Sequence, residues 1–225
     1  MNVDADLRLF LHMPKCAGTT IKDWLSANMS NAVRFDYESY FKIPRCERNT
    51  SILKKLLEPE SGDRDKIIYG HFFPVKYFGT QKPENYKLVT ILRDPVDRVL
   101  SHYKYWNSES FPDHYLWRKM KENSWSFEEF AFCEEMQNFY SQYLIQVPVG
   151  SFDYIGLFED FEKSVSRCFE VLGVDRANGI GSHRANMSNG ITLDAIDGNV
   201  LKKLKQHHAE DYLIYEYARE QYHKG

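Results

Sequence analysis

The feature of this sequence that most limits its fold is a pattern that occurs twice: a short apolar run, a polar loop and then a helix. Residues 7–12 are too few for a helix and apolar enough for a buried strand, and a helix can begin soon afterwards at Thr19. Residues 87–92 form a second apolar run, and Pro95 suits the first turn of a following helix. Buried strands that alternate with helices predict a parallel sheet with helices on both faces.

Other segments continue this alternation. Residues 66–72 and 154–158 are apolar runs that we expect to form strands. We expect helices over four further segments, 113–122, 126–145, 161–172 and 194–222. The aromatic side chains of residues 105–150 should mostly pack in the core, although Tyr103 and Trp106 could instead line a cleft. The pattern as a whole predicts an α/β fold with an aromatic-rich helical elaboration.

The charge of the chain limits its partners. Its 225 residues include 29 Lys and Arg against 32 Asp and Glu, for a formal net charge of -3. This balance argues against a protein that covers nucleic acid or an anionic membrane, so any basic site must be local. We find no apolar run long enough to span a membrane, and residues 1–6 lack the pattern of a signal peptide. We expect a cytoplasmic protein with no membrane anchor and no nucleic-acid or membrane partner.

The loop after the first apolar run has the parts of a phosphate cradle. Gly18 lets the backbone approach an anion, Thr19 and Thr20 supply hydroxyls, and a helix N-terminus attracts negative charge. Lys15 adds a mobile positive charge. The GxxxxGK[ST] pattern of nucleoside triphosphatases is absent because no lysine follows Gly18, and no strand-terminal carboxylate is evident to hold magnesium. We therefore expect an anion site without a metal ion.

Two motifs resemble those of a known family. Residues 12–20 read His-Met-Pro-Lys-Cys-Ala-Gly-Thr-Thr, and residues 93–101 read Arg-Asp-Pro-Val-Asp-Arg-Val-Leu-Ser. In order and position, they resemble two motifs of the sulfotransferases that use 3′-phosphoadenosine 5′-phosphosulfate (PAPS). The first is similar to the 5′-phosphosulfate loop of the glycan O-sulfotransferases of the heparan sulfate 2-O and 6-O type. Tyr69-Gly-His71 is a weaker similarity to the same branch.

The resemblance implies a P-loop-like parallel sheet of the sulfotransferase type, in a single domain over residues 1–225. It also implies PAPS as the sulfuryl donor, adenosine 3′,5′-bisphosphate (PAP) as the product, and no metal. The expected nucleotide contacts are the residues that match the two motifs: Lys15, Cys16, Ala17, Gly18, Thr19, Thr20, Arg93 and Ser101. Of these, Arg93 and Ser101 are expected to bind the 3′-phosphate, a group that ATP lacks.

Sulfuryl transfer to an alcohol needs positive charge at the leaving phosphate and a base for the hydroxyl proton. Lys15 can follow the charge onto the leaving oxygen. His71, at the end of a predicted strand, is the candidate base because imidazole titrates near neutrality; the alternative is a structural histidine. The predicted reaction is an in-line displacement that transfers the sulfuryl group to a hydroxyl of a saccharide or another hydroxylated acceptor.

The acceptor itself is constrained by charge. Basic residues of the segment 42–55 are interspersed with neutral and acidic ones, whereas a long sulfated polymer calls for a sustained basic groove. This pattern favours a neutral oligosaccharide or a hydroxylated metabolite. Two other functions remain open at this point. One is a small-molecule kinase or nucleotide hydrolase with a degenerate P-loop, and the other is a nucleotide-binding module without catalysis.

Several residues outside the motifs have a structural interpretation beside a functional one. We expect His12 to be buried with a hydrogen-bonded partner, or else to support the site from behind the loop. We expect Arg98 to be a helix residue that forms a salt bridge rather than a ligand contact. Residues 183–190 have the polarity of a loop that covers a nucleotide or substrate. We expect the C-terminal helix to have a solvent-exposed face that carries a lysine cluster, Lys202, Lys203 and Lys205.

Overall fold

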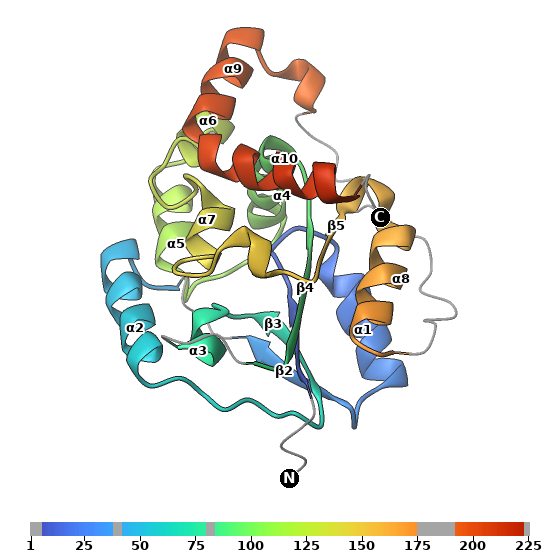
Figure 1. Ribbon diagram of the computed structural model, residues 1–225. Helices are drawn as coiled ribbons and strands as arrows, with labels where there is room; N and C mark the ends of the chain where they lie inside the picture. The colour runs from blue at the N-terminus through green and yellow to red at the C-terminus, as the bar shows by residue number, and fades with distance from the viewer. Residues whose placement is uncertain (1–5, 38–41, 80–83, 175–191, 223–225) are drawn as a thin grey trace.

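A computed structural model describes residues 6–37, 42–79, 84–174 and 192–222. Its centre is a sheet of five parallel strands in the order β2-β3-β1-β4-β5 (Figure 1). The strands are β1 (Leu7–Leu11), β2 (Val33–Tyr37), β3 (Ile67–His71), β4 (Tyr86–Leu92) and β5 (Tyr154–Leu157). The predicted α/β fold with a parallel sheet is therefore confirmed.

Helices cover both faces of the sheet. They are α1 (Gly18–Asn28), α2 (Arg45–Leu57), α3 (Val75–Phe78), α4 (Pro95–Ser108), α5 (Tyr115–Glu122), α6 (Phe127–Ala131), α7 (Phe139–Tyr143), α8 (Phe161–Val171), α9 (Gly198–His207) and α10 (Ala209–Tyr222). Short 3-10 turns span Val149–Ser151, Phe158–Asp160 and Leu193–Ala195. Figure 1 shows α1 and α8 on one side of the sheet and α2, α3, α5 and α7 on the other.

The strands alternate their side chains between two cores. Phe10 of β1 packs in one core with Ile21 of α1 and Phe169 of α8. Its neighbours Leu9 and Leu11 point to the opposite face, where the larger core includes the aromatic-rich helices. Because both faces are buried, the strands are nearly continuous apolar runs, which is the pattern that the sequence shows.

Strand β2 was not predicted from the sequence. The four strands predicted from apolar runs are present, with ends that differ by a residue or two. The edge strand β2 was not predicted because it is only partly covered: of its five residues, only Val33 and Asp36 are buried, and Phe35 and Tyr37 are partly exposed. Two charged residues, Arg34 and Asp36, also interrupt its apolar character.

Two predicted helices are broken in the structure. The expected helix over 126–145 is two short ones, α6 and α7, because the chain turns between them and Asn138 takes a left-handed conformation with φ 49°. The expected helix over 194–222 divides at His208, which is fully buried between α9 and α10. Among the described residues, no helix is long and apolar enough to cross a membrane.

The order of the strands brings the predicted site residues to one edge. β1 lies between β3 and β4, with Leu11 in register with Gly70 on one side and Thr90 on the other. The loop with Lys15 follows β1, His71 ends β3, and Arg93 follows β4. In a parallel sheet these carboxyl ends meet at the same edge, where ligands collect.

Ionisable groups are buried beneath α4 and α10. The Arg98 guanidinium lies 4.1 Å from the centre of the Phe139 ring, and no carboxylate of the described residues is hydrogen-bonded to it, so the expected salt bridge is not formed there. Burial, with the nearby charges of Arg98 and His207, lowers the pKa of His208 to about 3. The native state therefore keeps His208 neutral well below the pH at which the unfolded chain protonates it.

This burial predicts acid sensitivity of the fold. As the pH falls below about 6.5, the unfolded chain binds a proton at His208 and the native chain does not, so the free energy of unfolding decreases by up to about 1.4 kcal/mol per pH unit from this group. His208→Leu should remove this contribution between pH 6 and pH 4. Urea unfolding of both proteins at several pH values measures the slope, and equal slopes would contradict the expectation.

Candidate functional site

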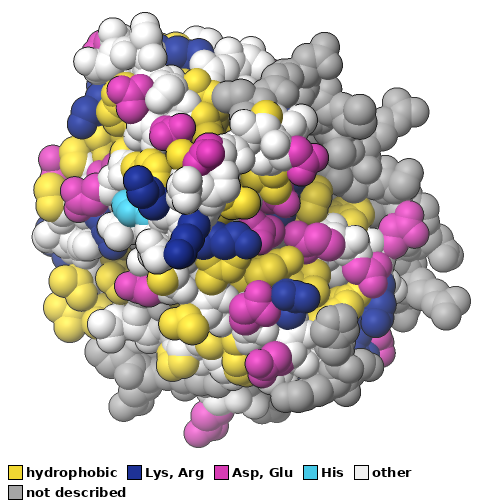
Figure 2. Space-filling view, turned by 90° about the horizontal axis from the view of Figure 1, so that it is seen from above, with side chains coloured by type: hydrophobic (Ala, Val, Ile, Leu, Met, Phe, Trp, Pro, Cys, Tyr) yellow, Lys and Arg dark blue, Asp and Glu magenta, His cyan; other side chains and the backbone are white. Residues whose placement is uncertain are grey.

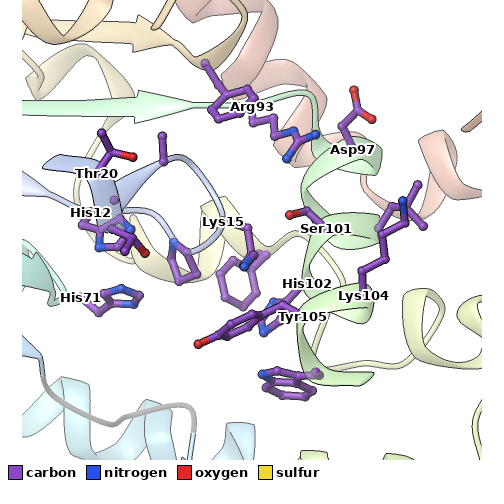
Figure 3. Close-up of a pocket in the computed structure, with 18 of the residues that line it drawn as sticks. His12, Lys15, Thr20, His71, Arg93, Asp97, Ser101, His102, Lys104 and Tyr105 are labelled. Atoms are coloured by element: carbon purple, nitrogen blue, oxygen red, sulfur yellow. The ribbon is translucent and has the colours of Figure 1, made fainter. Parts of the chain in front are cut away.

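A cavity of about 830 Å³ opens at the carboxyl edge of β1, β3 and β4. Eight of the nine residues predicted as nucleotide contacts or as the base line it, all except Cys16: Lys15, Ala17, Gly18, Thr19, Thr20, His71, Arg93 and Ser101. In Figure 3, Lys15 lies between His71 on one side and Arg93 and Ser101 on the other. The structure thus brings both motifs and the candidate base to one cavity.

The loop between β1 and α1 is shaped to present backbone N–H groups. Lys15 and Ala17 both have positive φ angles, 69° and 63°, which alternate the direction of successive peptide units. Helix α1 begins at Gly18 with no side-chain cap and no acidic residue in its first turn. The N–H groups and the positive end of the helix dipole are therefore placed to receive an anion.

Gly18 is required by a close contact. A Cβ atom built at this position would lie 1.6 Å from Nε2 of His12, far inside any allowed distance. The carbonyl of Gly18 also accepts a 2.8 Å hydrogen bond from the hydroxyl of Tyr69. The start of α1 therefore packs directly against the His12 ring and is hydrogen-bonded to Tyr69 of β3. These two contacts position the loop relative to the sheet.

His12 supports the site from behind. Its ring is 3.3 Å from the Tyr37 hydroxyl through Nδ1 and contacts the His71 ring edge-on, with 4.3 Å between the ring centres. It also lines the cavity, and it is half-buried. His12 therefore has the hydrogen-bonded partner expected from the sequence and, in addition, backs both Gly18 and His71.

Cys16 faces away from the cavity. Its backbone N–H donates to the carbonyl of Met13 at 3.2 Å, and its buried sulfur lies 3.5 Å from the hydroxyl of Tyr140. That hydroxyl also donates to the carbonyl of Arg93 at 2.7 Å and accepts from the Arg93 N–H at 3.1 Å. Tyr140 therefore ties the loop after β1 to the loop after β4.

A second set of contacts orients the start of α4. Asp94 caps the helix by accepting from the N–H groups of Val96 and Asp97, and Tyr212 of α10 donates its hydroxyl to the same carboxylate at 3.1 Å. The Arg93 guanidinium lies 4.5 Å from the centre of the Phe158 ring. Arg93 lies in the loop just before α4 and Ser101 lies two turns into the helix, so one loop and the helix that follows it carry both groups to the cavity.

Burial lowers the pKa of Lys15. Its Nζ lies 3.7 Å from the centre of the Tyr105 ring. Burial and then the neighbouring charge of Arg93 lower the pKa of Lys15 to about 8. At neutral pH the Lys15 side chain is mostly protonated. A bound anion would raise its pKa and stabilise the charged form.

His71 is a neutral imidazole in this setting. Its ring packs 4.9 Å from that of Tyr37 as well as against His12. Burial, with a smaller effect of the charge on Lys22, lowers the pKa of His71 to about 3. The side chain is therefore unprotonated across the physiological range, although a pKa this low makes it a weak base; a negative charge bound nearby would raise the pKa and strengthen the base.

The sequence missed several residues that line the cavity. Asp97, Lys104 and Tyr105 lie on the same face of α4 as Ser101. Their spacing of four, three and four residues from Ser101 is the signal that could have found them once α4 was recognised. Phe158, expected to end a strand, begins a 3-10 turn and also lines the cavity.

Other expectations have mixed outcomes. Trp106 lines the cavity, whereas Tyr103 packs against Phe127 and Phe130 in the core. The predicted covering loop, 183–190, lies outside the described residues. The lysine cluster of α9 is exposed, as expected.

Charges on the surface are mixed in sign. On the face seen in Figure 2, Lys and Arg side chains are interspersed with Asp and Glu. Arg48, one of the basic residues of segment 42–55, is buried and donates to Gln142 and Glu135, so it adds nothing to the surface charge. On this face, several Lys and Arg side chains gather near the centre, and Asp and Glu side chains lie around them (Figure 2).

Comparison with protein families identifies the chain. The model of the Sulfotransferase family matches residues 4–218. The chain belongs to the sulfotransferase family. It is therefore an enzyme of the transferase class, and the two motifs that line the cavity lie inside the matched region. No curated protein matches this sulfotransferase.

Solved structures give weaker likenesses. A sulfotransferase from Alicyclobacillus acidocaldarius is 16% identical, with 95% of this chain and 97% of that chain covered and a TM-score of 0.46. A mouse sulfotransferase in complex with PAP is 13% identical, with 91% and 64% covered and a TM-score of 0.38. A retinol dehydratase in complex with retinol and PAP is 15% identical, with 78% and 63% covered and a TM-score of 0.33. At these TM-scores, the family assignment rests on the family model alone.

The contact between Gly18 and His12 yields a prediction for the sulfotransferase. In Gly18→Ala the new methyl group forces the His12 ring or the loop to move, so we expect PAP affinity to fall at least tenfold and the free energy of unfolding to fall by about 1–3 kcal/mol. Calorimetry and urea unfolding measure the two effects. Gly198→Ala is the matched control, because a Cβ there meets nothing within 4 Å. Unchanged PAP affinity in both variants would contradict the role of Gly18.

Proposed function

We propose that this sulfotransferase uses PAPS to sulfate a hydroxyl of a saccharide or another hydroxylated acceptor. The observation that carries the proposal is the convergence of the uncapped start of α1, Lys15, Arg93 and Ser101 in one cavity with His71. A nucleotide with a 5′-phosphosulfate and a 3′-phosphate needs two separate anion sites, and this cavity offers two.

The residues fit the two ends of such a donor. The N–H groups at the start of α1, with Thr19 and Thr20, bind the 5′-phosphosulfate. Arg93 and Ser101 bind the 3′-phosphate from the loop and helix that follow β4. Ala17 and Gly18 bring the backbone close to the anion, and Cys16 supports them through its contact with Tyr140.

The proposed reaction is a single displacement at sulfur. The acceptor oxygen forms a bond to sulfur while the bond from sulfur to the bridging phosphate oxygen breaks, and PAP leaves. His71 takes the acceptor's hydroxyl proton on its neutral ring. Lys15 stabilises the negative charge that develops on the leaving phosphate oxygen. His71 acts as a neutral imidazole, the form that burial favours, whereas Lys15 acts as a charged ammonium, which it remains below about pH 8 although burial lowers its pKa.

We propose that the chain lies near the glycan O-sulfotransferase branch of the family. The phosphosulfate loop and Tyr69-Gly-His71 support kinship with the glycan O-sulfotransferases of the heparan sulfate type. The interspersed charges favour an acceptor less anionic than heparan sulfate. The kinase alternative is left without support, because the family transfers sulfuryl rather than phosphoryl groups and no GK[ST] sequence follows the loop.

The assignment of the 3′-phosphate site is tested by nucleotide selectivity. We expect PAP to bind more tightly than 5′-AMP, and Arg93→Ala to weaken PAP about 10- to 100-fold while leaving 5′-AMP nearly unchanged, since one charged hydrogen-bonded pair contributes about 1.5–3 kcal/mol. Calorimetry measures both ligands. Arg118→Ala, an exposed arginine of α5, is the control. Equal affinity of the wild-type protein for the two nucleotides would remove this role from Arg93 and Ser101.

The pKa values of Lys15 and His71 predict the pH profile. Lys15 loses its proton as the pH rises through about 8 in the free enzyme, so kcat/KM for PAPS should fall above that pH. His71 stays neutral down to about pH 3 and should cause no loss between pH 5 and pH 7. Lys15→Arg should remove the alkaline decrease, because arginine keeps its charge. An alkaline decrease that persists in Lys15→Arg would assign it to another group, and turnover retained in His71→Ala would move the base elsewhere.

A further inference from the structure

The end of the cavity away from Arg93 is lined by imidazole rings with unused hydrogen-bonding capacity. His71, His102 and His114 all line it. In the part of the chain that the structure describes, Nδ1 of His102 and Nδ1 of His114 are buried without a hydrogen-bond partner, so a ligand in the cavity would meet each ring at its other nitrogen, Nε2. His102 is only 7% exposed. Unpaired polar groups in such a setting destabilise a protein unless a ligand or water satisfies them.

Aromatic faces separate these polar groups. His102 and His114 both meet the Trp106 ring edge-on, with ring centres 4.5 Å and 4.6 Å apart. Phe139 and Tyr143 complete this end of the cavity. Figure 3 shows His71 and His102 on the side of Lys15 opposite to Arg93, so this end is distinct from the proposed 3′-phosphate site. Flat apolar walls with a few hydrogen-bonding nitrogens suit a ring-shaped ligand with polar substituents.

The imidazoles are neutral and therefore offer a ligand hydrogen bonds rather than charge. Burial is the main cause that lowers the pKa of His102 far below its usual value and that of His114 to about 4. Arg98 and Lys15 act on His102 in the same direction, as do Lys42, Arg48 and Arg118 on His114, while Glu135 opposes them. A neutral imidazole carries one donor and one acceptor, which matches a hydroxyl group.

We propose that this end of the cavity is the acceptor site and that it binds an uncharged ring bearing several hydroxyls. Two hydroxyls bond to His102 and His114, the ring packs against the aromatic walls, and a further hydroxyl reaches His71. The inference rests on the proposed sulfuryl transfer and adds the class of acceptor and the residues that select it.

Two other acceptor classes fit less well. A phenol with one hydroxyl would satisfy His71 and leave the other imidazoles unpaired, and a site built for hydrogen bonds discriminates strongly against a ligand that lacks them. The exposed Lys42 could pair with a sulfate group of a sulfated oligosaccharide, but the neutral imidazoles offer no charge to the other sulfates. Both classes therefore serve as comparisons.

The first experiment compares acceptors with labelled PAPS. The probes are methyl β-galactoside and myo-inositol as neutral polyhydroxylated rings, 4-nitrophenol as a single-hydroxyl ring, and a heparan sulfate octasaccharide. We expect kcat/KM for at least one neutral polyol to exceed that for the other two classes by tenfold or more. A preference for 4-nitrophenol or for the octasaccharide overturns the proposal, and so does PAP binding without transfer to either polyol.

The second experiment removes the selecting nitrogens while keeping ring shape. His114→Phe and His102→Phe should each raise the KM for the polyol about tenfold, because each loses one hydrogen bond, and should leave PAP affinity unchanged. His207→Phe, a histidine of α9 outside the cavity lining, is the matched control. His114 is half-buried and tolerates replacement if His102→Phe does not fold.

The outcomes separate the two levels of inference. An unchanged polyol KM in His114→Phe overturns the acceptor site while the sulfuryl transfer stands. A wild-type protein that does not bind PAP overturns the proposed function itself. A raised KM with unchanged PAP affinity supports the acceptor site, because a merely structural role would disturb both ligands.

Discussion

The site depends on one hydroxyl group more than on any other single contact. The Tyr140 hydroxyl bonds to both backbone groups of Arg93 and lies against the sulfur of Cys16, so it sets the spacing between the two loops that the sequence motifs form. Tyr140 is itself held, because its N–H donates to the buried carboxylate of Asp211 at 2.9 Å. In the proposed function, two anion sites accept one nucleotide and need a fixed separation, which this buried hydrogen-bonded contact would supply.

The same region explains why so many ionisable groups are buried around the cavity. The aromatic-rich helices exclude water from one side of the site, which keeps His71, His102 and His114 neutral and weakens the proton affinity of Lys15. Low polarity strengthens the interaction of Lys15 with a bound anion and leaves the imidazoles as hydrogen-bonding groups rather than charges. The formal net charge of -3 is therefore compatible with strong anion binding, because the few cations involved act at short range.

Local pattern made some parts of the molecule predictable. The strands buried on both faces are continuous apolar runs, and the motifs that follow β1 and β4 are contiguous in sequence, so the fold class and most of the cavity-lining motif residues could be read directly. The edge strand β2 was missed because it is half-exposed and charged. The broken helices at 126–145 and 194–222 were missed because helical spacing continues through Asn138 and His208, and only their tertiary surroundings impose the turns.

The sequence by itself determined the four buried strands, the two loops with their charged and hydroxyl residues, and the family to which they point. These features are local, since each depends on residue types within a few positions of one another. The tertiary structure alone decided that Gly18 rests on His12, that Tyr140 joins loops whose residues are far apart in the chain, and that His102 and His114 converge on the cavity with His71. Such contacts depend on how the aromatic helices pack over the sheet, and packing between distant segments leaves no periodic signal in the sequence.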